Sequence, residues 1–215
     1  MRNSVNYLKF DLRIIKKNVK QYLLALIPFI IFMFFGHAYI FAISYLFLFL
    51  LILAAIPFST QGNEKSTEMY YMFPTKISSM VFGRFLYLIC STLLIFIVNI
   101  TIMAYLYKIN ELQNFEILAT CLSGIVSLVI CFIQYPIYYK VGIENGRIIS
   151  IIIYLIPAFI VVMLPNYLKE NNLFTNLIFG NDKIRIIMLF SLVTVIFIGY
   201  ISYLISCRIC KKKEV

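Results

Sequence analysis

Few residues in this sequence of 215 have the types and spacing that catalysis or metal binding requires. His37 is the single histidine and falls in a turn between two apolar runs, so neither a histidine-based metal site nor a serine–histidine pair is available within the apolar segments. Cys207 and Cys210 have CxxC spacing, but a second pair for zinc and a thioredoxin-like context are both missing, which favours ordinary interfacial packing. No GxxxxGK[ST] phosphate loop occurs. We therefore expect a chain that is not an enzyme and holds no metal or cofactor of its own.

The most distinctive group of polar residues lies in the stretch NEKSTEMYYMFPTK, between two long apolar runs. Asn63 can cap a helix, and Glu64 then lies in the first turn, where the helix dipole favours an acid. Glu64, Glu68 and Tyr71 recur at spacings of four and three, which predicts one helical face. Pro74 ends the helix, because the residue before a proline is pushed out of helical geometry. The stretch predicts a short amphipathic helix, and a solvated polar connector is the simpler alternative.

The surrounding sequence is that of a membrane protein. Hydrophobic residues make up 62% of the chain and charged residues 13%, about half of the charged fraction of a soluble domain. A bilayer core of about 30 Å requires about 20 mainly apolar residues in a helix. Segments that meet this condition, the first of them the weakest, are residues 21–35, 38–58, 80–107, 118–139, 148–168 and 186–207. We predict an all-α membrane protein with six transmembrane helices, in which residues 1–215 form one transmembrane domain.

The remaining segments of this domain have separate roles. Residues 1–20 carry an apolar stripe and, one position later, a basic stripe, formed by Val5, Leu8, Leu12, Ile15 and Val19 and by Lys9, Arg13, Lys16 and Lys20. This pattern predicts an amphipathic helix in the membrane interface, with a plain charged anchor as the alternative. Residues 21–58 hold the first two spans, 59–79 the loop, 80–207 the other four spans and 208–215 a basic tail. Thr75, Ser78 and Ser79 are predicted to cap the third span.

The distribution of Lys and Arg predicts the orientation. Of the 19 basic residues, all but four fall in segments on the side of the N-terminus, the exceptions being Lys108, Lys169, Lys183 and Arg185. An excess of Lys and Arg marks cytoplasmic segments, so both termini are predicted to be cytoplasmic. The net charge of +10 then faces anionic lipid headgroups, and we expect no nucleic-acid partner.

The deepest polar side chains of the predicted spans are neutral. Ion-driven carriers commonly place a carboxylate at membrane depth, and the Asp and Glu residues here all fall outside the spans. The deepest polar residues include Asn99 and Gln134, for which interhelical hydrogen bonds are the simpler explanation. A position along a translocation path is the alternative for these two residues. For residues 166–185, with an apolar middle at 173–179, a small helix in the outer leaflet and a solvated loop both stay open.

The arrangement resembles a small bacterial ABC permease of the type-2 exporter family. Three features carry the resemblance: the basic amphipathic helix with LKFDLRIIKKN (8–18), the stretch EKSTEMYYMFPTK followed by SSMVFGRF (78–85), and a longer outer segment before the last span. The compact size is similar to that of permeases that export amphipathic peptides of the phenol-soluble modulin type, or that confer immunity to antimicrobial peptides.

This resemblance implies that the stretch is a coupling helix that docks on a separate ATPase. The residues that would contact the ATPase are Glu64, Lys65, Glu68, Tyr70 and Tyr71; Pro74 would end the helix, and Arg84 would anchor the third span at the inner headgroups. It also implies a dimer with an identical or sibling permease, two ATPase copies that bind ATP and Mg²⁺, and a bacterial plasma membrane. The cargo would be amphipathic peptides or lipids. An ATPase-independent channel or transporter, and a membrane scaffold or insertase-like helper, are the alternatives.

Overall fold

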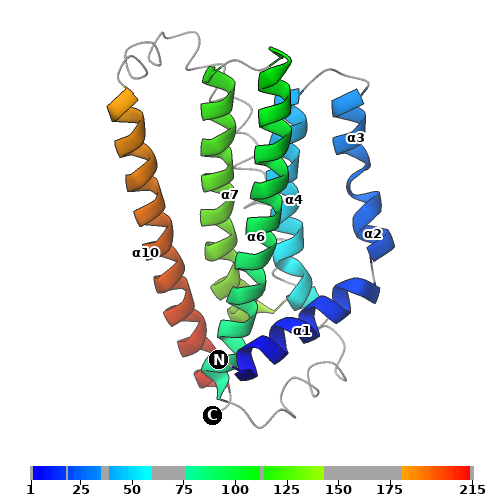
Figure 1. Ribbon diagram of the computed structural model, residues 1–215. Coiled ribbons are helices and arrows are strands. Elements are labelled where there is room, and N and C mark those ends of the chain that lie inside the picture. The colour runs from blue at the N-terminus through cyan, green and yellow to red at the C-terminus, as the bar shows by residue number, and fades with distance from the viewer. Residues whose placement is uncertain are drawn as a thin grey trace.

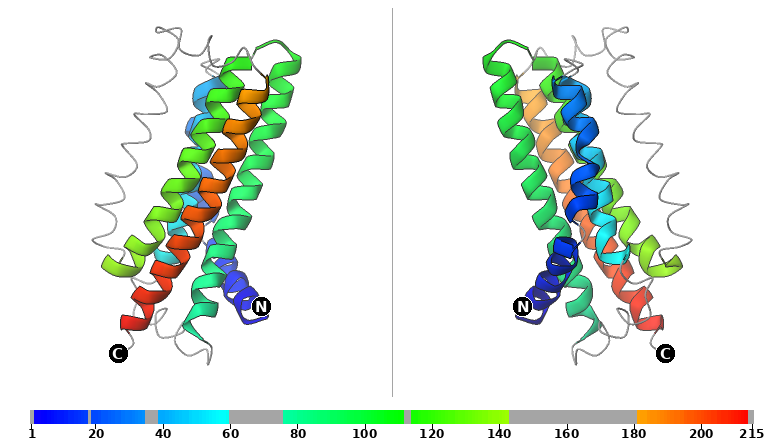
Figure 2. Two further views of the ribbon diagram at one scale, coloured as in Figure 1. Left: turned by 90° about the vertical axis from the view of Figure 1, so that its left-hand side faces the viewer. Right: turned by 90° about the vertical axis from the view of Figure 1, so that its right-hand side faces the viewer.

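Long helices standing side by side make up most of the structure, a computed structural model (Figures 1 and 2). It describes residues 2–17, 19–34, 39–59, 76–111, 114–142 and 181–213. The regular secondary structure of these segments is α-helical. The long helices are α4 (Tyr39–Ser59), α6 (Ile77–Lys108), α7 (Asn114–Val141) and α10 (Asn181–Lys213). In the part of the chain that the structure describes, four helices are long and apolar enough to cross a membrane.

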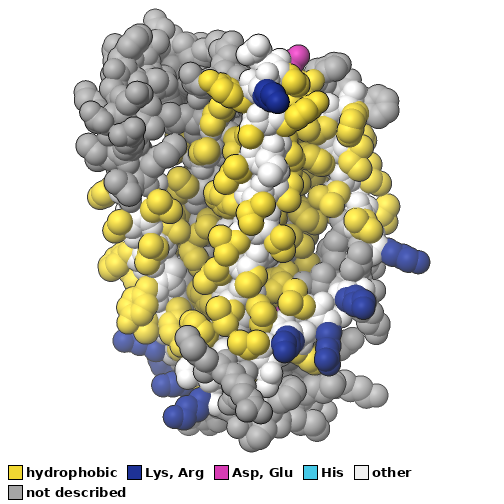
Figure 3. All heavy atoms as spheres, viewed as in Figure 1, with side chains coloured by type: hydrophobic (Ala, Val, Ile, Leu, Met, Phe, Trp, Pro, Cys, Tyr) yellow, Lys and Arg dark blue, Asp and Glu magenta, His cyan; other side chains and the backbone are white. Residues whose placement is uncertain are grey.

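The two ends of the bundle differ. We call the end that carries the start of α6 and the ends of α4, α7 and α10 the termini end, because the N- and C-termini lie there, and the opposite end the far end (Figure 1). Lys and Arg side chains gather at the termini end, below a broad band of hydrophobic side chains (Figure 3). The outward side chains of this band are strongly exposed, as at Leu94 (65%) and Ile196 (70%). Such a surface fits a lipid environment.

Most predicted spans are confirmed as helices. Residues 38–58, 80–107, 118–139 and 186–207 correspond to α4, α6, α7 and α10, each of which continues a few residues further at one or both ends. The predicted fifth span, residues 148–168, lies outside the described residues, as do His37 and residues 166–180. Residues 181–185 belong to α10 and not to a loop.

The predicted first span, residues 21–35, is not one continuous helix. The chain forms α2 (Val19–Leu24) and α3 (Ile27–Phe34), with a turn between them. Pro28 explains the break, because proline has no N–H for the carbonyl four residues earlier and its ring collides with that carbonyl. The hydroxyl of Tyr45 in α4 donates a hydrogen bond to the Ala25 carbonyl at 2.6 Å, which fixes the turn against the bundle.

The capping prediction for the third span is wrong for Ser78 and Ser79, and Thr75 lies outside the described residues. Helix α6 begins at Ile77, and Lys76 is its N-cap without a side-chain hydrogen bond. Ser78 and Ser79 lie in the first turn, where the Ser79 amide donates to the Lys76 carbonyl at 2.8 Å. The turn is therefore closed by the backbone.

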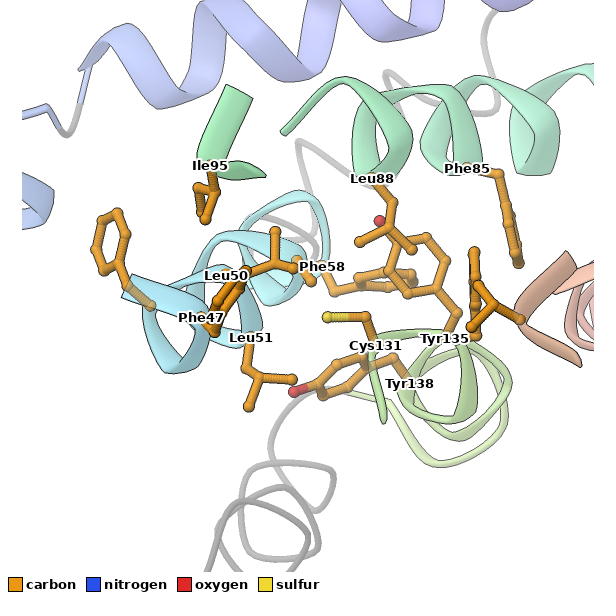
Figure 4. Packing of buried hydrophobic residues seen from close by; sticks show 14 of the residues in the cluster. Phe47, Leu50, Leu51, Phe58, Phe85, Leu88, Ile95, Cys131, Tyr135 and Tyr138 are labelled. Carbon is orange, nitrogen blue, oxygen red and sulfur yellow. The ribbon is translucent and has the colours of Figure 1, made fainter. Parts of the chain in front are cut away.

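The core of the bundle is built from aromatic and aliphatic side chains (Figure 4). Phe47 of α4 lies edge-on to Phe96 of α6, with ring centroids 5.1 Å apart. A Cβ atom at Gly124 of α7 would lie 2.7 Å from the Phe47 ring, so this glycine makes room for the phenylalanine. Leu50, Leu88 and Cys131 fill the interior nearer the termini end.

Helix α1 (Arg2–Lys17) lies across the bundle at the termini end and packs mainly on α6 (Figure 1). Ser4, Tyr7 and Asp11 are buried, and we call this set the docked face. The predicted helix is confirmed, and two residues of its apolar stripe point away from the bundle. Val5 and Leu12, which we call the apolar face, are 39% and 48% exposed. The basic face, which is also exposed, consists of Lys9, Arg13 and Lys16.

The close approach of α1 to α6 depends on Gly83. A Cβ atom at this position would lie 2.6 Å from the Tyr7 Cβ and 2.8 Å from the Ser4 carbonyl oxygen. Carbon atoms normally pack about 3.5–4.0 Å apart. Only glycine therefore lets α1 lie this near to α6.

Candidate functional site

The predicted coupling segment lies outside the described residues, including Glu64, Lys65, Glu68, Tyr70, Tyr71 and Pro74. The helices on both sides of it are described. Helix α4 ends at Ser59 and α6 begins at Ile77, both at the termini end (Figure 1). A force on the segment therefore first reaches the side chains buried beside these two helix ends.

Those side chains form a compact group around a buried arginine. We call it the Arg84 cluster, and it consists of Phe58 from α4, Arg84 and Phe85 from α6, and Tyr135, Tyr138 and Tyr139 from α7. Arg84 is completely buried. Its guanidinium carbon lies 4.6 Å from the centroid of the Phe58 ring and 5.3 Å from that of Tyr139. The Tyr135 hydroxyl donates a hydrogen bond to the Arg84 carbonyl at 3.2 Å.

Aromatic contacts tie this cluster to the neighbouring helices. The Phe58 ring lies 5.0 Å from Tyr135, 5.1 Å from Tyr138 and 5.0 Å from Tyr139, measured between centroids. Phe85 lies 4.9 Å from Tyr135 and 5.7 Å from Tyr203 of α10. All of these pairs except Phe58–Tyr138 are edge-to-face, and such pairs contribute about 0.5–1.5 kcal/mol each beyond their buried area. The cluster therefore joins α4, α6, α7 and α10 in one rigid group.

Two hydrogen bonds extend this group along α6. The Tyr203 hydroxyl of α10 donates to the Ser78 carbonyl in the first turn of α6, at 3.5 Å. The Tyr87 hydroxyl of α6 donates to the Leu53 carbonyl of α4 at 3.1 Å. The first three turns of α6 are thus held on two sides, next to the point where the predicted coupling segment joins the helix.

A buried acid accompanies the buried arginine. Asp11 of α1 is 1% exposed, and it is the one buried acidic side chain that the described residues contain. It lies close enough to Tyr135 and Tyr139 for its charge to act on both phenols. Removing one member of a compensated pair of buried charges is strongly destabilising. Because the two opposite charges share one region, each offsets the cost of burying the other.

The implied role of Arg84 as a headgroup anchor is wrong. A side chain at the headgroups would keep its guanidinium in water or against phosphate, whereas Arg84 lies in the interior over two aromatic rings. The signal was present in the sequence, since Arg84 falls inside the predicted span 80–107. Ionisable residues within a transmembrane segment face the bundle interior and mark functional sites. The aromatic partners in YPIYY (135–139) were not singled out in the sequence.

Asn99 and Gln134 are both buried, with 0% and 1% exposure. Within the described parts of the chain, neither side-chain amide has a hydrogen-bond partner. The structure does not bring them together. Asn99 lies one turn from Phe96, which faces Gly124 of α7, and Gln134 lies ten residues further along that helix. Because α6 and α7 run in opposite directions, these two offsets add, and the two amides are about 20 Å apart along the bundle axis.

Metal and disulfide chemistry find no support among the residues described. No group of three or more His, Cys, Asp or Glu side chains is placed to hold a metal ion in the described segments. No disulfide joins the cysteines there. Cys210 is buried and Cys207 is half-buried on α10. Their CxxC spacing serves the packing of this helix.

A bundle of long apolar helices, with basic side chains at one end and a buried arginine beneath them, defines a multi-pass membrane protein. Residues 7–211 match the family described as ABC-2 family transporter protein, so the chain belongs to this family. Its members are permease components of ABC transporters, which confirms the resemblance to type-2 ABC permeases. No curated protein and no solved structure matches the chain. The narrower likeness to exporters of phenol-soluble modulins stays a prediction.

Proposed function

We propose that this chain is the transmembrane subunit of an ABC exporter powered by a separate ATPase. Family membership supports a permease, and an ABC permease associates with an ATPase. The sequence has no phosphate loop, so ATP and Mg²⁺ belong to the partner. Two permease copies, identical or siblings, would combine with two ATPase copies in a bacterial plasma membrane. Both termini would face the cytoplasm, because Lys and Arg gather at the termini end (Figure 3).

The observation that carries this proposal is the position of the Arg84 cluster. Phe58 is the last residue but one of α4, and Arg84 lies about two turns into α6. Residues 60–75 join these two helices, so both attachment points of the predicted coupling segment lead directly into the cluster. An ATPase that moves the segment would displace α4 and α6 together. Because α7 and α10 are packed on the same aromatic rings, they would follow.

The contacts to the ATPase would be made by Glu64, Lys65, Glu68, Tyr70 and Tyr71, with Pro74 ending the coupling helix. Acid and tyrosine side chains at helical spacing offer hydrogen bonds to a docking groove. Arg84 would not touch the ATPase. It would hold the receiving ends of α4, α6 and α7 together while the coupling helix moves.

The cargo would be amphipathic peptides, of the phenol-soluble modulin or antimicrobial type, or lipid-like molecules. The chain contains 20 Phe and 16 Tyr and few charged residues, which gives any path through it an apolar, aromatic wall. Such walls suit apolar and amphipathic ligands. Asn99 and Gln134 would meet the path at different depths.

Purification in mild detergent followed by an ATPase assay tests the proposal. We expect an ATPase to co-purify with the wild-type chain and to be lost from the variant Glu68→Ala/Tyr71→Ala. Glu111→Ala/Tyr107→Ala is the matched control, since it removes an exposed acid and an exposed tyrosine at the far end. This control should keep the ATPase.

Two outcomes would contradict the proposal at different levels. If the ATPase stays bound to Glu68→Ala/Tyr71→Ala, the coupling site is misplaced. If no ATPase accompanies the wild-type chain, the exporter proposal fails. Cargo flux into proteoliposomes of the chain alone would then indicate a channel or transporter, and its absence a scaffold or insertase-like helper.

A further inference from the structure

The docked, apolar and basic faces of α1 point in different directions from the helix axis. An α-helix advances by about 100° per residue. The apolar face therefore lies about a third of a turn from the docked face, and the basic face lies about a sixth of a turn beyond that, opposite the docked face. The docked face is buried on α6, whereas the other two faces are exposed. The basic face consequently points away from the bundle, with an apolar edge beside it.

The order of the docked, apolar and basic faces around α1 fits a helix that lies in a membrane interface. A helix in the interface buries its apolar edge in the acyl boundary and keeps Lys and Arg at the headgroups. Helix α1 lies where the hydrophobic band of the bundle ends, among the basic side chains of the termini end (Figure 3). Val5 and Leu12 on its apolar face are 39% and 48% exposed in the chain by itself. A lipid surface covers both exposed faces at once.

We propose that the basic face of α1 binds anionic lipid headgroups and that this binding holds α1 on α6. The ammonium groups of Lys9 and Lys16 and the guanidinium of Arg13 supply charge-assisted hydrogen bonds to lipid phosphate. An acidic protein surface is the other class of ligand that such a face attracts. The exposed apolar face favours lipid, because a soluble acidic partner would leave Val5 and Leu12 in water.

The docking of α1 gives this lipid site a connection to the interior. The contact at Gly83 leaves no free space between α1 and α6, since Tyr7 and Ser4 of α1 already pack against Gly83. Asp11 reaches the region of the Arg84 cluster from the same docked face. Lipid that fixes α1 therefore also fixes the first turns of α6. The effect of this on coupling rests on the proposed function, whereas the lipid site itself does not.

Thermal unfolding of the purified chain alone tests the lipid site. The chain is titrated in neutral detergent with phosphatidylglycerol or, separately, with phosphatidylcholine. We expect phosphatidylglycerol to raise the unfolding temperature of the wild type more than phosphatidylcholine does. The triple variant Lys9→Gln/Arg13→Gln/Lys16→Gln should need at least about tenfold more phosphatidylglycerol for the same effect, because it loses the three side chains that donate charge-assisted hydrogen bonds to lipid phosphate.

The matched control is Arg208→Gln/Lys211→Gln/Lys212→Gln, which removes three exposed positive charges from α10 at the same end. It should keep the response of the wild type. The proposal is overturned if the control loses the response equally, because general charge attraction then explains it. It is also overturned if the α1 variant keeps the wild-type response to phosphatidylglycerol. Loss of a co-purifying protein from the α1 variant would instead assign the basic face to a protein partner. Phosphatidylglycerol that co-purifies with each variant, counted per chain, gives a second measure if a variant unfolds in detergent.

Discussion

Replacement of Gly83 by alanine should loosen α1 from the bundle. The added Cβ would lie 2.6 Å from the Tyr7 Cβ and 2.8 Å from the Ser4 carbonyl oxygen. The first distance falls about 1 Å short of normal carbon packing. One of the two neighbours is backbone, which a change of rotamer cannot move, so α1 itself must shift. Overpacking of this kind costs about 1–3 kcal/mol.

Two opposing terms decide the net effect of this substitution. Alanine in a helix interior is favoured over glycine by about 0.5–1 kcal/mol. The net loss for Gly83→Ala is therefore at most about 2.5 kcal/mol, and it should grow with Gly83→Val. Gly199→Ala in α10 is the control, because its Cβ would meet only the Phe132 ring at 3.0 and 3.1 Å. A ring can tilt away, so this variant should be neutral or stabilised by up to about 1 kcal/mol.

Hydrogen exchange and thermal unfolding together measure this prediction. Amide exchange in α1 should accelerate in Gly83→Ala, while the amides of α7 and α10 keep their protection. The unfolding temperature should fall for Gly83→Ala and not for Gly199→Ala. If both variants behave alike, or if α1 keeps its protection in Gly83→Ala, the close contact does not hold α1 in place.

Three further substitutions test the interior. Arg84→Met should lower stability by about 3–5 kcal/mol in thermal unfolding, since Asp11 then stays buried without an opposite charge, and the added change Asp11→Asn should restore part of the loss. A purely additive double variant would show that the two charges do not offset each other. Asn99→Leu should raise stability by about 1–3 kcal/mol, because its amide has no partner in the described residues, and a loss of stability would reveal one. Tyr135→Phe should cost about 1 kcal/mol through the hydrogen bond to the Arg84 carbonyl, and a neutral result would contradict that bond.

The long helices could be predicted from the sequence because their signal is local. An apolar run such as that of α6 satisfies its backbone within the helix, so length and hydropathy identify it without knowledge of its neighbours. Pro28 indicates a break or a bend in the first span, because it blocks a helical hydrogen bond. Helices α4 and α7 continue through Pro57 and Pro136, so a proline by itself does not decide between a break and a bend.

The site was harder to predict because it depends on contacts between distant segments. Burial of Arg84 requires Phe58 and Tyr139 to meet it from two other helices, and no local spacing brings those three residues together. The face of α1 that docks on the bundle is likewise decided by Gly83, far along the chain. Periodicity identified the two exposed stripes of α1, which are uniform in type. The docked face combines Ser4, Tyr7 and Asp11, so no single property marks it.

The turn between α2 and α3 has a consequence for how motion spreads through the chain. A continuous helix transmits rotation along its axis, whereas a turn absorbs it in a few backbone dihedrals. Because Tyr45 donates a hydrogen bond to the Ala25 carbonyl in this turn, we expect a rotation of α2 to be absorbed there and not to reach α3. The close contact between α1 and α6 at Gly83 contains no turn that could absorb a movement. The stiffest mechanical route from α1 into the bundle therefore crosses space to α6, although the shortest covalent route runs through α2 and α3.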